Sequence, residues 1–211
     1  MHPIEHPRSL RVTKSVRGIL ANKEDVSEVQ LDDAYKPFFT GKLNRYVSEK
    51  PLEFVKLGDS LRECPKDYDF FVGERILVGR IVSRQFRVMA QLVNEEFITK
   101  KDLYIFIRRS EFLKSLFARI INSSLVSYLK TKGSSTAKKD DFSQLTLSDL
   151  REIPIPKIRD EEQQPITTLV TQILAAKRQH PAADTSSLES EVVRLVYGLY
   201  GRADRGGGGD H

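Results

Sequence analysis

The residues with the clearest chemical potential in this 211-residue chain are three closely spaced arginines, Arg80, Arg84 and Arg87. A guanidinium is planar, stays charged and offers paired N–H donors, so it can hold a phosphate or bond two acceptors on one guanine. Gln85 and Gln91 lie nearby, and a glutamine amide can pair with adenine in a similar bidentate manner. This set of residue types predicts contact with nucleic acid.

Further cations flank the same region. Two lysines precede the apolar run 103–107, an arginine follows it, and three more lysines stand in the small, polar segment 131–139. Contacts of this kind position a protein on phosphates without reading the base sequence, and a polar loop can become ordered on DNA. The candidate phosphate contacts are Lys100, Lys101, Arg108, Lys132, Lys138 and Lys139.

Charge is unevenly distributed along the chain. Residues 1–74 hold twelve Lys and Arg against thirteen Asp and Glu, residues 75–139 hold fourteen against four, and residues 140–211 hold eight against twelve. The basic excess therefore lies in the central third. An evenly solvated surface would spread its lysines more widely, so this concentration favours a nucleic-acid partner.

Composition excludes several function classes. No apolar run approaches the roughly 18 residues of a membrane span, and the N-terminal MHPIEHPRSLRV lacks the apolar core of a secretory signal. Cys64 is the only cysteine, and the four histidines are far apart, so we predict no disulfide and no metal site. Paired acids such as Asp140-Asp141 fall short of a nuclease site. We expect no catalytic residue, no membrane contact and a cytoplasmic location.

Strands followed by helices must position these cations. Ile76 to Val78 and Leu103 to Ile107 are apolar runs of strand length, and Phe86 to Leu92 alternates as a half-buried strand does. Apolar residues then recur at helical spacing over Glu111–Lys130, which predicts a helix packed on the sheet. A short helical turn is expected over 145–150, followed by an extended Ile-Pro-Ile-Pro segment, because each proline disfavours helix at the residue before it.

Two amphipathic helices end the chain. Acidic residues from Glu161 open the first, and Lys177 and Arg178 close it where cations suit the helix dipole. Asp184 or Thr185 caps the second. A short link between two such helices predicts an antiparallel hairpin.

The fold class is predicted as α+β: a central twisted mixed or antiparallel sheet with a packed helix, plus the C-terminal helical hairpin. We divide the chain into an entry segment of uncertain placement at 1–33, a main domain at 34–160, the hairpin at 161–201 and a glycine-rich, disordered tail at 202–211. Pro37 is expected in a turn. Four phenylalanines are assigned to the core: Phe38, Phe39, Phe70 and Phe71.

The order of the motifs resembles a known family. VGERILVGRI is followed by NEEFITKKDLYIFI, then by IINSSLVSYLKTKG, and then by LTLSDLREIPIPKI. In this order they are similar to the TaqI-like C-terminal specificity domain, the target-recognition domain of bacterial N6-adenine DNA methyltransferases and of type IIG restriction-modification enzymes. The resemblance covers residues 34–201, so the main domain at 34–160 would be the DNA target-recognition domain.

The resemblance implies recognition of double-stranded DNA on behalf of a methyltransferase catalytic domain, in cis or in trans. Lys42, Asn44 and Arg45 form a further candidate patch by analogy with the family. The chain lacks the family's Asn-Pro-Pro-Tyr motif, a glycine-rich S-adenosylmethionine motif and a nuclease carboxylate cluster. We therefore expect no enzymatic activity and no cofactor in this chain alone. S-adenosylmethionine, and magnesium where an endonuclease is fused, would belong to the parent enzyme.

A protein-interaction module is the second hypothesis. The hairpin at 165–200 would pair with another subunit, as spacer helices do in type I restriction systems, and the sheet would be scaffold. Truncation after Arg159 is expected to separate the two hypotheses: it should spare DNA binding under the first and remove partner binding under the second, and both can be true together.

Overall fold

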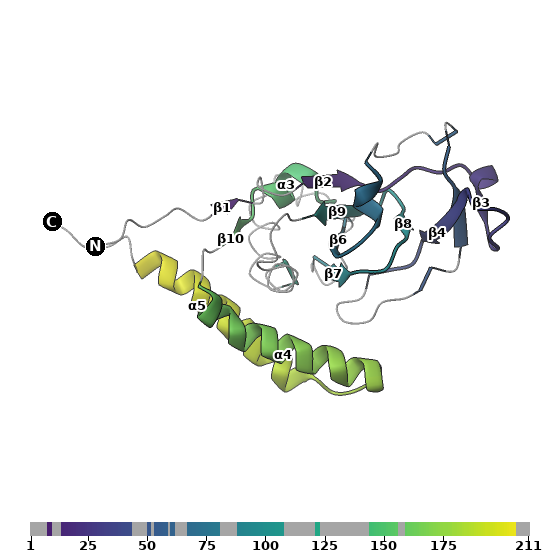
Figure 1. Ribbon diagram of the computed structural model, residues 1–211. Coiled ribbons are helices and arrows are strands. Elements are labelled where there is room, and N and C mark those ends of the chain that lie inside the picture. Colours follow the sequence, from purple (N-terminus) through teal and green to yellow (C-terminus); the bar gives the residue numbers. More distant parts are fainter. Residues whose placement is uncertain are drawn as a thin grey trace.

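The computed structural model describes residues 8–9, 14–43, 50–51, 53–58, 60–61, 67–80, 88–107, 121–122, 144–155 and 159–205. In these residues two four-stranded sheets stand side by side, and a long helical pair runs diagonally past the first sheet (Figure 1). The predicted α+β class, with its sheet and C-terminal helical hairpin, is confirmed.

The first sheet is antiparallel throughout and has the order β2-β9-β6-β7. Its strands are β2 (Lys14–Arg17), β6 (Arg75–Gly79), β7 (Ala90–Val93) and β9 (Leu103–Ile107). The strands predicted at Ile76 to Val78 and Leu103 to Ile107 are present as β6 and β9. The strand predicted from Phe86 to Leu92 overlaps β7 only from Ala90 onward; Val88 and Met89 are not strand, and residues 86–87 lie outside the described residues. The inner strands β6 and β9 are buried on both faces, which is why their sequences read as continuous apolar runs and not as an alternation.

The second sheet has the order β3-β5-β4-β8, in which only the β4–β8 pair is parallel. Its strands are β3 (Val26–Ser27), β4 (Tyr35–Phe39), β5 (Glu53–Lys56) and β8 (Ile98–Thr99). Pro37 lies inside β4, so the prediction of a turn there is wrong. Proline has a φ that an extended strand tolerates, and Pro37 precedes Phe38, the first β4 residue that pairs with β8.

Two apolar clusters use opposite faces of the first sheet. Leu77 and Ile105 face a cluster that lies between the first and second sheets. The 3-10 helix Tyr68–Phe71 contributes buried side chains to the same cluster. Ile76 and Tyr104 face the other cluster. All four phenylalanines assigned to the core are buried in the cluster between the sheets, as predicted: Phe38, Phe39, Phe70 and Phe71.

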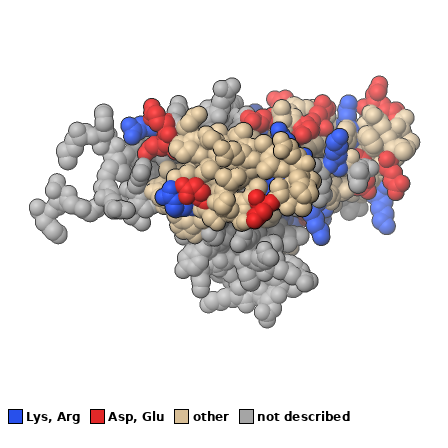
Figure 2. All heavy atoms as spheres, turned by 90° about the horizontal axis from the view of Figure 1, so that it is seen from below, with Lys and Arg blue, Asp and Glu red and all other residues tan. Residues whose placement is uncertain are grey.

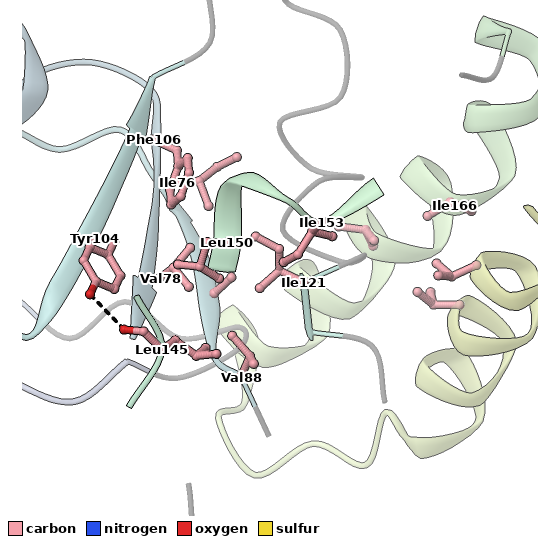
Figure 3. Close-up of a cluster of buried hydrophobic side chains, with 14 of the residues drawn as sticks. Ile76, Val78, Val88, Tyr104, Phe106, Ile121, Leu145, Leu150, Ile153 and Ile166 are labelled. Atoms are coloured by element: carbon pink, nitrogen blue, oxygen red, sulfur yellow. Dashed lines mark hydrogen bonds between the residues drawn. The ribbon is translucent and has the colours of Figure 1, made fainter. Parts of the chain in front are cut away.

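The helical hairpin, α4 (Asp160–Gln179) and α5 (Ser186–Arg205), belongs to the same core as the first sheet. Ile166 of α4 and Val196 of α5 are buried in the cluster that contains Val78 of β6 and Tyr104 of β9 (Figure 3). The hairpin therefore docks on the sheet instead of projecting from it.

The end of the second helix differs from the expectation. α5 continues through Arg205, so residues 202–205 of the expected disordered tail are helical. A single glycine at position 201 does not end a helix, and the glycine run starts only at Gly206. Residues 206–211 lie outside the described residues.

Short elements join these layers. Helix α3 (Leu147–Arg151) occupies the predicted helical turn, and β10 (Pro154–Ile155) pairs with β1 (Arg8–Ser9) in the predicted extended segment. Of the helix expected over Glu111–Lys130, only Ile121 and Asn122 lie within the described residues; both are helical and buried.

Candidate nucleic-acid interface

Strands β2, β6 and β9 of the first sheet each have one end at the same edge of the sheet. The pairing register sets Gly79, the last residue of β6, opposite Leu103, the first residue of β9, and sets Arg17 of β2 opposite Tyr104. Each chain segment carries a cation at or next to this point. We call the set of Arg17, Arg80, Lys100 and Lys101 the cationic sheet end.

The turn between β8 and β9 is held from two sides. Arg17 donates from Nε to the backbone oxygen of Lys101 at 2.9 Å, and the backbone N–H of Arg80 donates to the backbone oxygen of Asp102 at 2.9 Å. The N–H of Gly18 also donates to the oxygen of Leu103 at 2.9 Å. These contacts fix the backbone from which the lysines of this turn extend.

Arg80 also connects the sheet to the segment before α3. Its Nη2 donates to Oε1 of the exposed Gln144 at 2.6 Å, and its backbone oxygen accepts from the N–H of Leu145 at 2.9 Å. The hydroxyl of Tyr104 donates to the backbone oxygen of Leu145 at 2.8 Å (Figure 3). Burial raises the pKa of Tyr104, although Arg80 opposes this shift, so the phenol keeps the proton that it donates.

Lys100 brings a further cation-bearing segment to the same place. Its Nζ donates to the backbone oxygen of Thr40 at 2.6 Å, and Lys42, which is exposed, follows two residues later. An open cleft of ≈ 540 Å³ adjoins the turn and is lined by Lys23, Lys100 and Lys101 together with the acids Glu28, Glu53 and Asp102. The cleft has both signs of charge and shares Lys100 and Lys101 with the cationic sheet end, whereas Arg17 and Arg80 do not line it.

The structure brings together some of the predicted contact residues. Arg80, Lys100 and Lys101 meet at the cationic sheet end, with Lys42 nearby. Arg17 was missed because it stands in the entry segment, outside the basic block; its place opposite Tyr104 depends on a pairing across more than 80 residues. Seven predicted contacts lie outside the described residues: Arg45, Arg84, Arg87, Arg108, Lys132, Lys138 and Lys139.

Two polar residues of the basic block are not available to a ligand in this structure. Arg75 is fully buried, so its charge does not add to the surface. Gln91 is also buried, in β7, and the proposal that its amide reads a base is not supported by this position.

The hairpin presents a different surface. α4 has no charged residue between Glu162 and Lys177, and Figure 2, which views the molecule from the hairpin side, shows a broad area with few charged side chains. Such a face gives little attraction to phosphates, so the cationic sheet end is the better candidate for DNA.

Metal and membrane sites receive no support within the part of the chain that the structure describes. There, no group of three or more His, Cys, Asp or Glu residues could hold a metal ion. No described helix is long and apolar enough to cross a membrane.

Comparison with known proteins identifies the family. Residues 36–155 match the model of the TaqI-like C-terminal specificity domain. The chain therefore belongs to this family of DNA target-recognition domains from restriction-modification enzymes.

One curated relative is RM.MjaORFECS2P of Methanocaldococcus jannaschii, whose name describes a type II restriction enzyme and methyltransferase. It is 34% identical over 198 residues, which cover 90% of this chain and 16% of the relative. This chain thus spans a minor part of the relative's length.

Two solved structures show weaker likeness. The type IIL restriction-modification enzyme MmeI, solved in complex with DNA, matches with a TM-score of 0.47 at 13% identity. The match covers 76% of this chain and 21% of the MmeI chain. The HsdS subunit from Thermoanaerobacter tengcongensis matches with a TM-score of 0.46 at 21% identity. The match covers 94% of this chain and 44% of the HsdS chain.

Proposed function

We propose that this chain binds double-stranded DNA at the cationic sheet end and selects the sequence on which a separate catalytic domain acts. The observation that carries the proposal is the meeting of cations from separate chain segments at one end of the first sheet: Arg17, Arg80 and the Lys100–Lys101 pair. The family match supports DNA as the polyanion.

The contacts divide by chemistry. Lys42, Lys100 and Lys101 hold phosphates, because an ammonium acts as a point charge and positions the duplex. Arg80 stands where the connection between β6 and β7 begins, and that connection contains Arg84 and Arg87. These arginines read base edges in the major groove, where guanine offers two acceptors to one guanidinium.

The proposed parent activity is transfer of a methyl group to adenine N6, with or without a fused endonuclease. S-adenosylmethionine would be bound by the catalytic domain, in cis or in trans, and this chain would contribute target choice alone. The relative named as a restriction enzyme and methyltransferase supports this proposal, since 90% of the present chain aligns with a part of it.

Fluorescence anisotropy with a labelled duplex tests DNA binding. The proposal predicts an affinity that falls steeply with salt, because each phosphate contact releases counterions. It also predicts that reversing Arg80, Arg84 and Arg87 to glutamate abolishes binding by a folded protein. Lys14→Gln is the matched control, since Lys14 lies at the opposite end of β2 and pairs with Asp67 at 3.3 Å. Unchanged binding by the triple variant would refute the proposal.

A second role for the hairpin is favoured by its exposed surface, which has few charged side chains and on which Tyr197 is 43% exposed. Under this proposal the face pairs with another protein subunit. Truncation after Arg159 does not test it cleanly, because it would remove Ile166, Val196 and their neighbours from the core. Replacing Tyr197 by lysine leaves that core intact; retained partner binding by this variant would count against the second role.

A further inference from the structure

We propose that Gln144 is a positioning residue that orients the guanidinium of Arg80 for reading a base edge at the cationic sheet end. This inference rests on the proposed function and deepens it, because it assigns base selectivity to a pair of side chains that the fold brings together. Nη2 of Arg80 donates to Oε1 of Gln144 at 2.6 Å, although 64 positions separate the two residues in the chain.

The main chain of Arg80 is held on both sides. Its N–H donates to the backbone oxygen of Asp102 at 2.9 Å, and its carbonyl oxygen accepts from the N–H of Leu145 at 2.9 Å. Arg80 also directly follows Gly79, which pairs with Leu103 at the end of β6. The Cα of Arg80 therefore has a set position, and the direction of its guanidinium depends on the side-chain torsions.

The segment that carries Gln144 is bonded to three strands of the first sheet. Leu145 bonds to the main chain just after β6 and accepts from the hydroxyl of Tyr104 in β9 at 2.8 Å (Figure 3). At the end of α3, Arg151 donates from Nε to Oγ of Ser15 in β2 at 3.0 Å, and from Nη2 to the backbone oxygen of Ser15 at 3.1 Å. The acceptor for Arg80 thus extends from a main chain that is itself anchored to the sheet.

An arginine that reads a base must present its N–H donors in a defined plane. Guanine offers O6 and N7 to two donors of one guanidinium, so rotation of that plane loses one or both bonds. The bond to Gln144 restrains this rotation through one of the five N–H donors. Arg80 is half-buried and Gln144 is exposed, so the pair lies at the surface, where DNA can reach it.

A glutamine suits this role better than a carboxylate would. The amide oxygen of Gln144 is neutral, so it orients the guanidinium and leaves the positive charge of Arg80 in place for DNA. A glutamate at the same position would also accept from Nη2, but its negative charge would oppose the attraction to phosphates. Orientation and charge can therefore be separated by substitution at position 144.

Two measurements separate positioning from simple stability: the discrimination between duplexes and the slope of log affinity against log salt. A substitution that only lowers the folded fraction weakens binding to every duplex by the same factor and leaves the slope unchanged. A substitution that releases Arg80 lowers discrimination at one base pair without a change of slope, because the charge of Arg80 remains. A substitution that adds a negative charge makes the slope shallower.

The experiment uses the full chain, the duplex that wild type enriches from a random library, and versions of this duplex with one base pair replaced. Arg80→Gln first identifies the base pair that Arg80 reads, as the one at which discrimination is lost. At this base pair Gln144→Ala should lower discrimination about tenfold, with an unchanged salt slope. Gln144→Glu should retain discrimination there and make the slope shallower by about one.

Gln164→Ala is the matched control, because Gln164 is an exposed glutamine on α4. Its discrimination and its salt slope should both equal those of wild type.

The outcomes are distinguishable. Wild-type discrimination by Gln144→Ala would overturn the inference, and so would a loss that is the same at every base pair. If Arg80→Gln loses discrimination at no base pair, Arg80 does not read a base and the inference falls with it. A wild-type chain that enriches no sequence would refute the proposed function instead.

Discussion

The guanidinium of Arg75 lies over the ring of Phe97, 4.6 Å from the ring centroid, and donates to the backbone oxygen of Phe97 at 3.1 Å. It also donates to the backbone oxygens of Gly73 at 2.9 Å and Glu95 at 2.8 Å. Because Arg75 begins β6 and Phe97 directly precedes β8, this contact joins the two sheets. Burial lowers the pKa of Arg75 to about 10, although nearby Glu95 and Glu96 oppose the shift.

Replacing Arg75 by methionine should destabilise the protein. The change leaves three backbone oxygens without their donor, and we expect the free energy of unfolding to fall by about 2–4 kcal/mol. Urea denaturation measures this loss. Arg194→Met is the control, because the Arg194–Glu191 pair is exposed and an exposed ion pair contributes little to stability. Equal stability of the two variants would contradict the role assigned to Arg75.

Two glycines should respond in opposite ways to substitution by alanine. A Cβ at Gly18 would lie 2.3 Å from the backbone oxygen of Lys100. Because this oxygen belongs to the backbone, the clash can be relieved only if the main chain shifts. Gly18→Ala should therefore cost about 1–3 kcal/mol. A Cβ at Gly198 in α5 meets nothing within 4 Å, so Gly198→Ala should stabilise by roughly 0.5–1 kcal/mol. Thermal unfolding of the pair checks both signs, and a stabilised Gly18→Ala would contradict the close approach.

Arg17→Gln should weaken DNA binding although Arg17 lies outside the basic central block. It removes one positive charge from the cationic sheet end, and the slope of log affinity against log salt should become shallower by about one. Anisotropy titrations over a range of salt concentrations measure the slope. Lys14→Gln, on the other end of the same strand, should leave it unchanged. Equal slopes for all three proteins would remove Arg17 from the interface.

Acid should weaken the fold partly through Asp25. Hydrogen bonds from Ser60 at 2.8 Å and from Asn22 lower the pKa of this buried carboxyl below 3.8. The unfolded state therefore takes up the proton first, so the stabilisation is present above pH 3.8 and is lost as the pH falls through the folded-state pKa.

The Asp25→Asn variant isolates this effect. It removes the titrating group, so its free energy of unfolding should differ most from that of wild type at neutral pH, and the difference should shrink as the pH is lowered below 3.8. Urea unfolding at neutral and acidic pH gives the comparison. A difference that does not change with pH would show that Asp25 does not contribute in this way.

Sequence patterns located the inner strands of the first sheet and both hairpin helices, because local physics decides these elements, but they did not locate the second sheet. Leu103 to Ile107 is too apolar to be anything but a buried element, and the acidic start and basic end of α4 agree with its dipole. Pro37 was misassigned because proline is common in turns, yet its fixed φ also suits a strand.

The site was less predictable, since it depends on contacts between distant segments. Arg75 and Arg80 look alike in the sequence, but Arg75 is buried against Phe97 whereas Arg80 lies at a strand end beside Asp102. Arg17 reaches the site only through pairing of β2 with β9.

The central claim is that the cationic sheet end recognises a particular DNA sequence, and a competition between two duplexes tests it most directly. The measurement compares the affinity of the chain for its library-enriched duplex with that for a scrambled duplex of the same length and composition, for wild type and for Arg80→Gln/Lys101→Gln. We predict at least about a hundredfold preference by wild type, as several mismatched base pairs would give, and weaker binding by the double variant. Equal affinity for both duplexes, unaffected by the double substitution, would contradict the claim.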